Sequence, residues 1–408
     1  MILIPLIILF VIVITKMQKG MFMAFLVLVA TKSIIDAFWE SKFGPLSILA
    51  LQGVLIPILF FDILKKRKTV PKFWLRTANI YLVAMSFGLV WGFLEKPLGA
   101  FENVFLSLNA YLGFFIIPLL INKQSDFRKL LIAIMIGGIF PILVSLYQFQ
   151  TGVIFQVRQT VGLIRYVGFY HDAFPVRFYG LMTLMAVLIY NTLFITKSIW
   201  LKIFMVLISM GAIFSIYLVF TKAGVGIIGL WIVLLLLFSK SKVKQVFSII
   251  VGLSVIFIVF GDTFYNSIEQ LFSKEIGYEA GDVKDVRYTL AGRGYIWDSA
   301  WNFWTTKQTI FFQWMGDGIV RPVHNEFLRV LMANGIIGLL LLVIFVFTMV
   351  KNVFKIHKTI RVFGLMLLGM YMIDCIGLVP GVYYYYNILV WGLIGLLLLR
   401  KDLFIKKI

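Results

Sequence analysis

A short stretch near residue 324 combines a histidine with cationic and helix-capping residues. His324 is followed by Asn325 and lies between Arg321 and Arg329. Histidine can accept a proton near pH 7 because its ordinary pKa is close to neutrality. Arginine binds phosphate groups through paired, charge-assisted hydrogen bonds. The stretch makes His324 a candidate general base in cationic surroundings, with Asn325 as a cap or orienting group. The alternative is an ordinary surface histidine.

Other cations occur where apolar runs begin or in neighbouring motifs. Arg293 precedes Trp297 by one helical turn, and Lys222 and Arg177 lie at the starts of apolar runs. An anionic leaving group needs cations that bind it and stabilise its developing charge. The candidate substrate-binding residues are Arg293, Lys222, Arg177, Arg321, Arg329, Asn325 and Trp297.

Three alternatives compete for the chemistry. A second acid–base pair is available at His171 and Asp172. Asp36 and Asp374 lie within apolar runs, where an ionisable residue is a candidate functional group. A hard-cation site would need clustered carboxylates. Such residues occur in one segment, but without the spacing of a calcium loop, so a solvated acidic stretch is preferred and no metal or cofactor is expected: Glu275, Glu279, Asp282 and Asp285.

The composition fixes the class of protein that must position these residues. Of 408 residues, 61% are hydrophobic and 14% charged, against about 45–50% and 25% in soluble domains. The apolar residues form runs of roughly the length that a membrane-spanning helix needs. The single cysteine, Cys375, excludes an intramolecular disulfide, and Met1–Ile14 predicts a retained first helix because it lacks a basic leader and a cleavage site.

The net charge of +20 is distributed in a way that indicates membrane orientation and not nucleic-acid binding. Every second connection is basic, and together these connections hold 24 Lys/Arg and three acidic residues. The alternate connections hold 13 of each sign. Lys and Arg favour the cytoplasmic side. The basic connections, which are therefore predicted to be cytoplasmic, are Thr15–Lys19, Asp62–Arg76, Asn122–Lys129, Thr196–Lys202, Ser239–Gln245, Lys351–Arg361 and Arg400–Ile408.

The apolar runs predict an all-α, polytopic transmembrane helical bundle with twelve or thirteen spans. Three regions are expected: membrane helices over 1–260 with a smaller external loop near 150–177, a large, partly helical external loop over 261–328 that carries the catalytic residues, and membrane helices over 329–408. The predicted spans are 1–14, 21–38, 45–61, 77–94, 105–121, 130–149, 178–195, 203–220, 223–238, 246–260, 329–350, 362–379 and 388–399.

The large loop is predicted to contain a helix over Gly294–Thr306. Trp297, Ala300, Trp301 and Trp304 recur there at helical spacing. Such a stripe is typical of a helix in the membrane interface, where indole rings lie at headgroup depth. Packing of the same stripe against the transmembrane bundle is the alternative.

Several of these segments resemble the O-antigen polymerase and ligase superfamily. The resemblance rests on Gly316-Asp317-Gly318, on His324-Asn325-Glu326-Phe327-Leu328 with the following Gly335-Ile336-Ile337-Gly338-Leu339, on Gly292-Arg293 before Trp297, and on Thr221-Lys222-Ala223-Gly224. The match is specific between about 291 and 342, and Gly335 and Gly338 are predicted to allow close helix packing. The family usually has arginine where this chain has Lys222, which keeps the charge but loses the bidentate fork.

The resemblance implies a membrane glycosyltransferase at the outer face of the cytoplasmic membrane. The expected donor is an undecaprenyl-diphosphate-linked glycan, whose diphosphate and sugars the candidate substrate-binding residues are then expected to bind. Transfer is expected to invert the sugar without a metal, and the resemblance favours a catalytic role for His324 over that of an ordinary surface histidine. A polymerase would extend a second lipid-linked glycan, whereas a ligase would transfer the chain to lipid A–core or protein. A chain-length regulator and a flippase are expected as further partners. A transporter or flippase is the rival reading, but it predicts short external loops and more mid-span charge.

Overall fold

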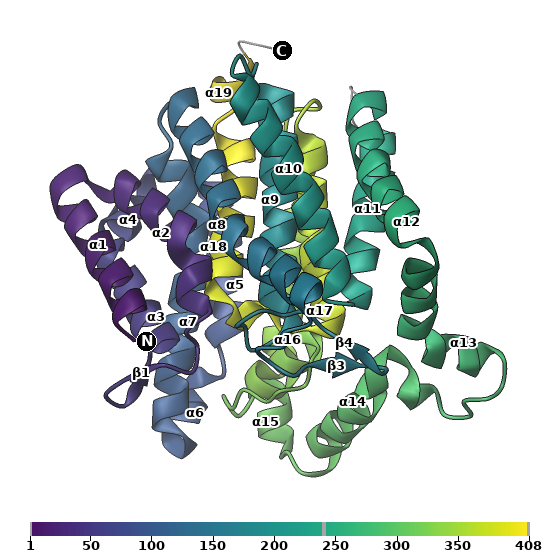
Figure 1. The fold of residues 1–408 in the computed structure, drawn as a ribbon. Coiled ribbons are helices and arrows are strands. Elements are labelled where there is room, and N and C mark those ends of the chain that lie inside the picture. Colours follow the sequence, from purple (N-terminus) through teal and green to yellow (C-terminus); the bar gives the residue numbers. More distant parts are fainter. Residues whose placement is uncertain (1, 239–241, 406–408) are drawn as a thin grey trace. The chain divides into compact units, whose positions relative to one another are not determined.

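The computed structural model describes residues 2–238 and 242–405, without the side chains of 242–249, 253, 255–260 and 405. Parts of the predicted basic segments 239–245 and 400–408 lie outside the described residues. Helices dominate the described chain (Figure 1). The helices are α1 (Leu3–Lys19), α2 (Met21–Asp36), α3 (Ile48–Leu59), α4 (Phe61–Lys66), η1 (Arg67–Thr69), α5 (Lys72–Ser86), α6 (Leu89–Glu95), α7 (Pro97–Leu120), α8 (Gln124–Thr151), α9 (Ala173–Leu193), α10 (Ile199–Leu218), α11 (Lys222–Phe238), α12 (Lys242–Leu271), α13 (Ser273–Glu279), η2 (Val286–Tyr288), α14 (Thr289–Thr306), α15 (Ile310–Met315), α16 (Glu326–Phe354), α17 (Arg361–Gly377), η3 (Pro380–Val382), α18 (Tyr384–Leu399) and α19 (Asp402–Ile405).

Two short antiparallel hairpins interrupt the helical order. One pairs β1 (Lys42–Phe43) with β2 (Leu46–Ser47), and the other pairs β3 (Gln159–Thr160) with β4 (Leu163–Ile164). The second hairpin lies in the predicted smaller external loop. The all-α prediction is confirmed for the bundle, whereas these strands were not expected from the sequence.

Each of the predicted spans overlaps a helix in the described residues, although 45–61 also includes β2 and 77–94 covers both α5 and α6. Within the described part of the chain, six helices are long and apolar enough to cross a bilayer, or seven if α3 and the segment Phe61–Thr69, bent by 46°, form one broken span. Several other apolar helices, such as α11 and α18, are shorter than 18 residues. The chain is therefore a multi-pass membrane protein, and the count of twelve or thirteen spans stays a prediction.

One compact unit comprises Met1–Gln52, Ile121–Ser273 and Asp402–Ile408. In it, α8 packs against α2 and α9, and α10 lies along α8 and α9. A polar link joins α2 to α9: Lys32 forms an ion pair with Asp36, and the hydroxyl of Tyr179 donates to Asp36 at 2.6 Å. Partnered in this way, Asp36 fixes the packing of two helices, because a buried charge needs a hydrogen-bonded partner.

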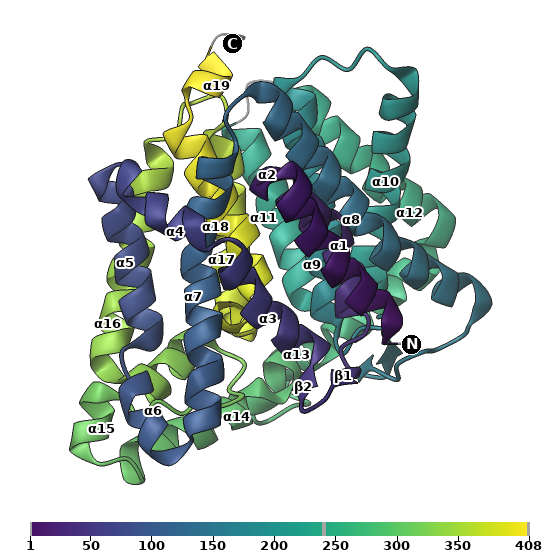
Figure 2. The ribbon, with the colours of Figure 1, turned by 90° about the vertical axis from the view of Figure 1, so that its left-hand side faces the viewer.

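The second unit comprises Gly53–Leu120 and Lys274–Lys401. Its centre is the contact between α7 and α18, which run side by side (Figure 2). A Cβ atom added to Gly113 would lie 2.7 Å from the Cα of Ile388, so glycine permits this close approach. Asn387 of α18 accepts hydrogen bonds from Tyr81 and Trp391, both at 2.9 Å. These bonds satisfy a polar side chain inside an aromatic core.

The helix α16 follows His324 and is interrupted at a glycine. Gly335 has φ +66°, and a Cβ atom added there would collide with the backbone of Trp314 at the end of α15. Asn334 accepts a hydrogen bond from the backbone N–H of Gly88 at 2.8 Å. The close packing predicted at Gly335 is therefore confirmed, and it fixes the first part of α16 against its neighbours.

Candidate functional site

In the second unit, Arg293 begins the regular part of α14. Leu290, Ala291 and Gly292 all have positive φ, so regular helix starts only after them. The Arg293 guanidinium lies against the end of α17, where a Cβ atom added to Gly377 would be 2.8 Å from Nη1. Glycine at position 377 therefore leaves room for the Arg293 guanidinium, which a side chain there would crowd.

His324 lies in a backbone segment that is held on both sides. The indole N–H of Trp297 donates to the carbonyl oxygen of Val323 at 3.1 Å. On the other side, the Asn325 amide donates to the carbonyl oxygen of Ile376 at 3.5 Å. His324 itself is exposed and has φ +50°, a conformation that non-glycine residues adopt at a cost of about 1–3 kcal/mol. Such a backbone conformation makes His324 a candidate functional residue.

Asn325 caps α16, as the sequence predicts. Its Oδ1 accepts a hydrogen bond from the backbone N–H of Leu328 at 3.0 Å. The cap satisfies one of the first N–H groups of the helix. Arg293, Trp297, His324 and Asn325 are thus brought together by α14, the start of α16 and the end of α17.

Arg321 contributes to loop structure through an acidic partner that was not predicted. Its guanidinium binds Asp317 in a bidentate pair, with Nη1–Oδ1 at 3.0 Å and Nη2–Oδ2 at 2.6 Å. The Asp317 carboxylate also accepts from the Gln308 amide at 2.9 Å. The guanidinium lies over the ring of Phe303 at 4.6 Å. Through these contacts Arg321 stabilises the loop that precedes His324 in the chain.

Arg329 is buried with a carboxylate. Its side chain is 4% exposed, and its Nη2 lies 2.6 Å from Oε1 of Glu326, whose side chain is 0% exposed. A second bond joins Nε to Oε2 at 3.1 Å. The expectation of a cationic neighbourhood for His324 is therefore wrong for Arg321 and Arg329, because a carboxylate neutralises each. Arg329 is covered by protein and not presented to a ligand.

An apolar pocket of about 330 Å³ adjoins this group. It lies between α14 and the first turns of α16, and Asn325 supplies its polar edge. Its walls suit an aliphatic chain or the apolar face of a sugar better than a charged group. The pocket is lined by Trp297, Trp301, Asn325, Phe327, Leu328, Leu331 and Leu339.

The tryptophan stripe of α14 is packed on one side, and its place in the membrane interface stays a prediction. Ala300 is buried with Val323 and Met332, and Trp304 packs against this cluster. Trp301, in contrast, is 50% exposed. Packing therefore holds one side of the stripe, and an exposed indole on the other side is free of the core cluster.

Lys222 and Arg177 lie in the first unit, at the starts of α11 and α9. The Thr221 hydroxyl accepts from the backbone N–H of Gly224 at 3.2 Å, and the Lys222 ammonium lies 5.4 Å from the centre of the Phe272 ring. Arg177 is buried, and its Cδ would be 3.5 Å from a Cβ atom added to Gly224. The structure therefore brings Arg177 to the turn that begins α11.

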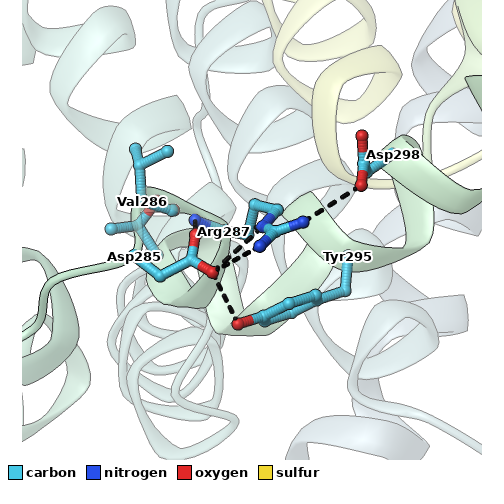
Figure 3. A network of polar contacts seen from close by, with 6 residues as sticks. Asp285, Val286, Arg287, Tyr295 and Asp298 are labelled. Atoms are coloured by element: carbon cyan, nitrogen blue, oxygen red, sulfur yellow. Dashed lines mark hydrogen bonds and ion pairs between the residues drawn. The ribbon is translucent and has the colours of Figure 1, made fainter.

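Asp285, one member of the acidic segment of the large loop, is paired with an arginine (Figure 3). Arg287 binds Asp285 at 2.8 Å and Asp298 at 3.1 Å. The hydrogen bonds from Arg287 hold the pKa of the Asp285 carboxyl well below its usual range. Tyr295 donates to the same carboxylate at 2.9 Å, and its own pKa is raised. Within the described residues, no three His, Cys, Asp or Glu side chains are grouped so that they could hold a metal ion.

The other candidate residues have structural partners. Asp172 caps α9 by accepting from the N–H of Ala173 at 2.6 Å, and the ring of His171 meets Trp39 edge-on at 4.6 Å. Asp374 and Cys375 are buried within α17. These contacts give His171 and Asp172 separate partners, which does not favour their action as an acid–base pair.

Comparison of the sequence with models of protein families and with characterised proteins found no match.

Sequence reasoning missed Asp317 and Glu326. Glu326 could have been found from spacing, because it precedes Arg329 by three residues within one helix, whereas Asp317 precedes Arg321 by four residues in a loop. Opposite charges at these separations meet on a helix, although only the second pair lies on one. Arg165 is a further cation of the smaller external loop that was not among the predicted binding residues.

Proposed function

We propose that the protein is a membrane glycosyltransferase that polymerises undecaprenyl-diphosphate-linked oligosaccharide repeat units into a surface polysaccharide. One observation carries the proposal: His324 is exposed, has a strained backbone, and is held by hydrogen bonds to the residues on both sides of it. Arg293 and Trp297 lie on the adjacent helix. The resemblance to the O-antigen polymerase and ligase superfamily at these residues supports the same function. Charge asymmetry supports an active site on the outer face of the cytoplasmic membrane.

In the proposed reaction, a hydroxyl of the acceptor glycan attacks the anomeric carbon of the donor sugar. An imidazole nitrogen of His324 takes the hydroxyl proton as the new C–O bond forms. The bond from the anomeric carbon to the phosphate oxygen breaks, and undecaprenyl diphosphate leaves with the electron pair. Attack opposite the leaving group inverts the anomeric centre, and Arg293 stabilises the developing phosphate charge.

Other residues are assigned supporting roles in this reaction. Trp297 and Asn325 hold the backbone of His324, and both line a pocket that suits an apolar part of a substrate. Lys222 and Arg177 are assigned to diphosphate binding in the first unit. Arg321 and Arg329, which pair with Asp317 and Glu326, are assigned to positioning and not to substrate contact.

A ligase would use the same proton transfer with a different acceptor. Lipid-linked glycans that accumulate in a deletion strain distinguish the two, since loss of a polymerase leaves single repeat units on the lipid and loss of a ligase leaves long chains. Mass analysis of the extracted lipids therefore tests the choice of acceptor directly.

A chain-length regulator and a flippase are expected to work with a polymerase.

The catalytic proposal is tested by His324→Ala, with His357→Ala as the matched control. His357 lies in the connection between α16 and α17, away from the proposed site. Purified protein in liposomes is supplied with lipid-linked repeat units, and product length is measured by mass spectrometry. We expect His324→Ala to lose about 10²–10⁴-fold in rate and to keep donor binding. Polymerisation by His324→Ala at the rate of His357→Ala would overturn the assignment, and parallel loss of donor binding would make His324 a binding residue.

A further inference from the structure

The β3–β4 hairpin of the first unit places two arginines opposite each other. Its turn consists of Val161 and Gly162, both with positive φ, which is the geometry of a two-residue hairpin turn. Continuing the register by one residue pairs Arg158 with Arg165. The backbone N–H of Arg165 donates to the carbonyl oxygen of Arg158 at 2.8 Å, which confirms the pairing. The hairpin therefore carries adjacent positive charges on one face.

Like charges in this arrangement are unfavourable. Residues directly opposite in an antiparallel pair project from the same face, and two equal charges there destabilise the pair. The Nε atom of Arg158 is buried and has no hydrogen-bond partner within the described part of the chain. An anion bound between the two guanidinium groups would remove the repulsion and accept from Nε. The hairpin thus has the features of an anion-binding element. Without an anion, the repulsion between its two arginines lowers its stability.

The hairpin is joined to the turn that begins α11. Nη2 of Arg165 donates to the carbonyl oxygen of Phe220 at 3.4 Å. The backbone N–H of Tyr166 donates to the carbonyl oxygen of Leu218 at 3.2 Å. Phe220 has φ +40° and directly precedes Thr221 and Lys222. The hairpin is therefore fastened to the segment from which Lys222 projects.

Arg177 reaches the same turn from α9. Its Cδ is placed against Gly224, as described above. Cations from three separate elements therefore gather around residues 220–224: the hairpin, the start of α9 and the start of α11. Several guanidinium groups and an ammonium suit an anion with more than one charge and several acceptor oxygens, which is the chemistry of a diphosphate.

We infer that the β3–β4 hairpin binds a diphosphate group through Arg158 and Arg165, together with Arg177 and Lys222. This assigns a role to the smaller external loop. The inference rests on the proposed function only in naming the diphosphate as that of the lipid-linked donor. The phosphate of an anionic phospholipid offers the same acceptor oxygens from another source, and the experiment below separates the two.

The test uses the purified full-length protein in neutral detergent. Binding of inorganic pyrophosphate and of farnesyl diphosphate is measured by titration calorimetry for wild type, Arg158→Gln, Arg165→Gln and the control Arg76→Gln. Arg76 is an exposed arginine of α5 in the second unit. Loss of one charge-assisted contact is expected to weaken binding by about tenfold or more. Arg76→Gln should bind both probes as wild type does.

A second readout separates ligand binding from a structural role. Without ligand, Arg158→Gln should melt at the wild-type temperature or above it, because the substitution removes a repulsion. With pyrophosphate, wild type should gain thermal stability and both hairpin variants should gain less. A structural role predicts the reverse, a lower melting temperature without ligand and an unchanged gain with it, and that result would overturn the inference.

Other results of the binding measurements also test the inference. Absence of saturable binding of either diphosphate by wild type, or equal binding by all variants, would overturn the inference. Arginine-dependent binding to phosphatidylglycerol vesicles but to neither diphosphate would assign the hairpin to the bilayer and overturn it as well. Arginine-dependent diphosphate binding in a protein that transfers no glycan would sustain the inference and refute the proposed function.

Discussion

Replacing Glu326 by glutamine should destabilise the protein more than any exposed ion-pair substitution. The Glu326 side chain is 0% exposed and holds the Arg329 guanidinium through contacts of 2.6 and 3.1 Å. The substitution keeps the shape of the side chain but leaves the Arg329 charge buried without a counter-charge. Breaking a buried pair in this way costs about 3–5 kcal/mol. The unfolding equilibrium should therefore shift by about a hundredfold to several thousandfold.

The measurement is unfolding by sodium dodecyl sulfate in mixed micelles, followed by circular dichroism. Asp62→Asn is the matched control, because Asp62 pairs with Lys65 at 3.0 Å while their side chains are 48% and 65% exposed. An exposed pair contributes about 0–1 kcal/mol. The double replacement Glu326→Gln with Arg329→Met should recover much of the loss, since no buried charge remains. A loss below about 1 kcal/mol in Glu326→Gln, equal to that in Asp62→Asn, would refute the reasoning.

Three further predictions concern the site, the topology and pH. Neutral replacement of Arg293 or Lys222 should remove most transfer activity at unchanged protein level, and Lys222→Arg should retain more than Lys222→Ala; equal, near-normal activity in all these variants would contradict their assignment to the diphosphate. Cysteine at Glu279 should react with an impermeant thiol reagent in intact cells, whereas labelling only after lysis would place the large loop on the cytoplasmic side. Because Arg287 lowers the pKa of Asp285, the stabilisation from this carboxylate is present above an unfolded pKa of about 3.9 and is lost as pH falls through the lowered value. Pulse proteolysis should then find the Asp285–Asp298 segment as resistant at pH 5 as at pH 7, and Asp285→Asn should be cut faster at both.

The sequence predicted the helices well because a bilayer demands long apolar runs with internally satisfied backbones. Helix boundaries were less accurate where helices continue beyond the apolar run. Helix α9 begins at Ala173 and not near 178, because Asp172 caps it and the buried Arg177 lies in its second turn. Hydropathy alone carries no signal for such a start, whereas the cap does.

The strands and the charge pairs needed information that hydropathy does not contain. The turn of the β3–β4 hairpin places Val161 at positive φ, although β-branched residues disfavour this conformation. No ordinary turn signal therefore marked it. The pairing of Arg321 with Asp317 depends on a non-helical loop that bends back on itself, so helical spacing alone would not have established the contact. The capping role of Asn325, in contrast, follows from local sequence and was predicted.

The conformation of His324 allows activity and stability to be separated in one position. At φ +50°, an alanine keeps the steric cost that histidine meets, whereas glycine does not. We therefore expect His324→Gly to be more stable than His324→Ala by about 1 kcal/mol, after the greater chain entropy of glycine is offset. Both variants lack the imidazole and should lose transfer to the same extent. Unfolding in mixed micelles measures the first difference, and the liposome assay measures the second. If His324→Gly were the less stable of the two, the left-handed conformation would not be held in the folded protein, and the argument from strain to function at His324 would fail with it.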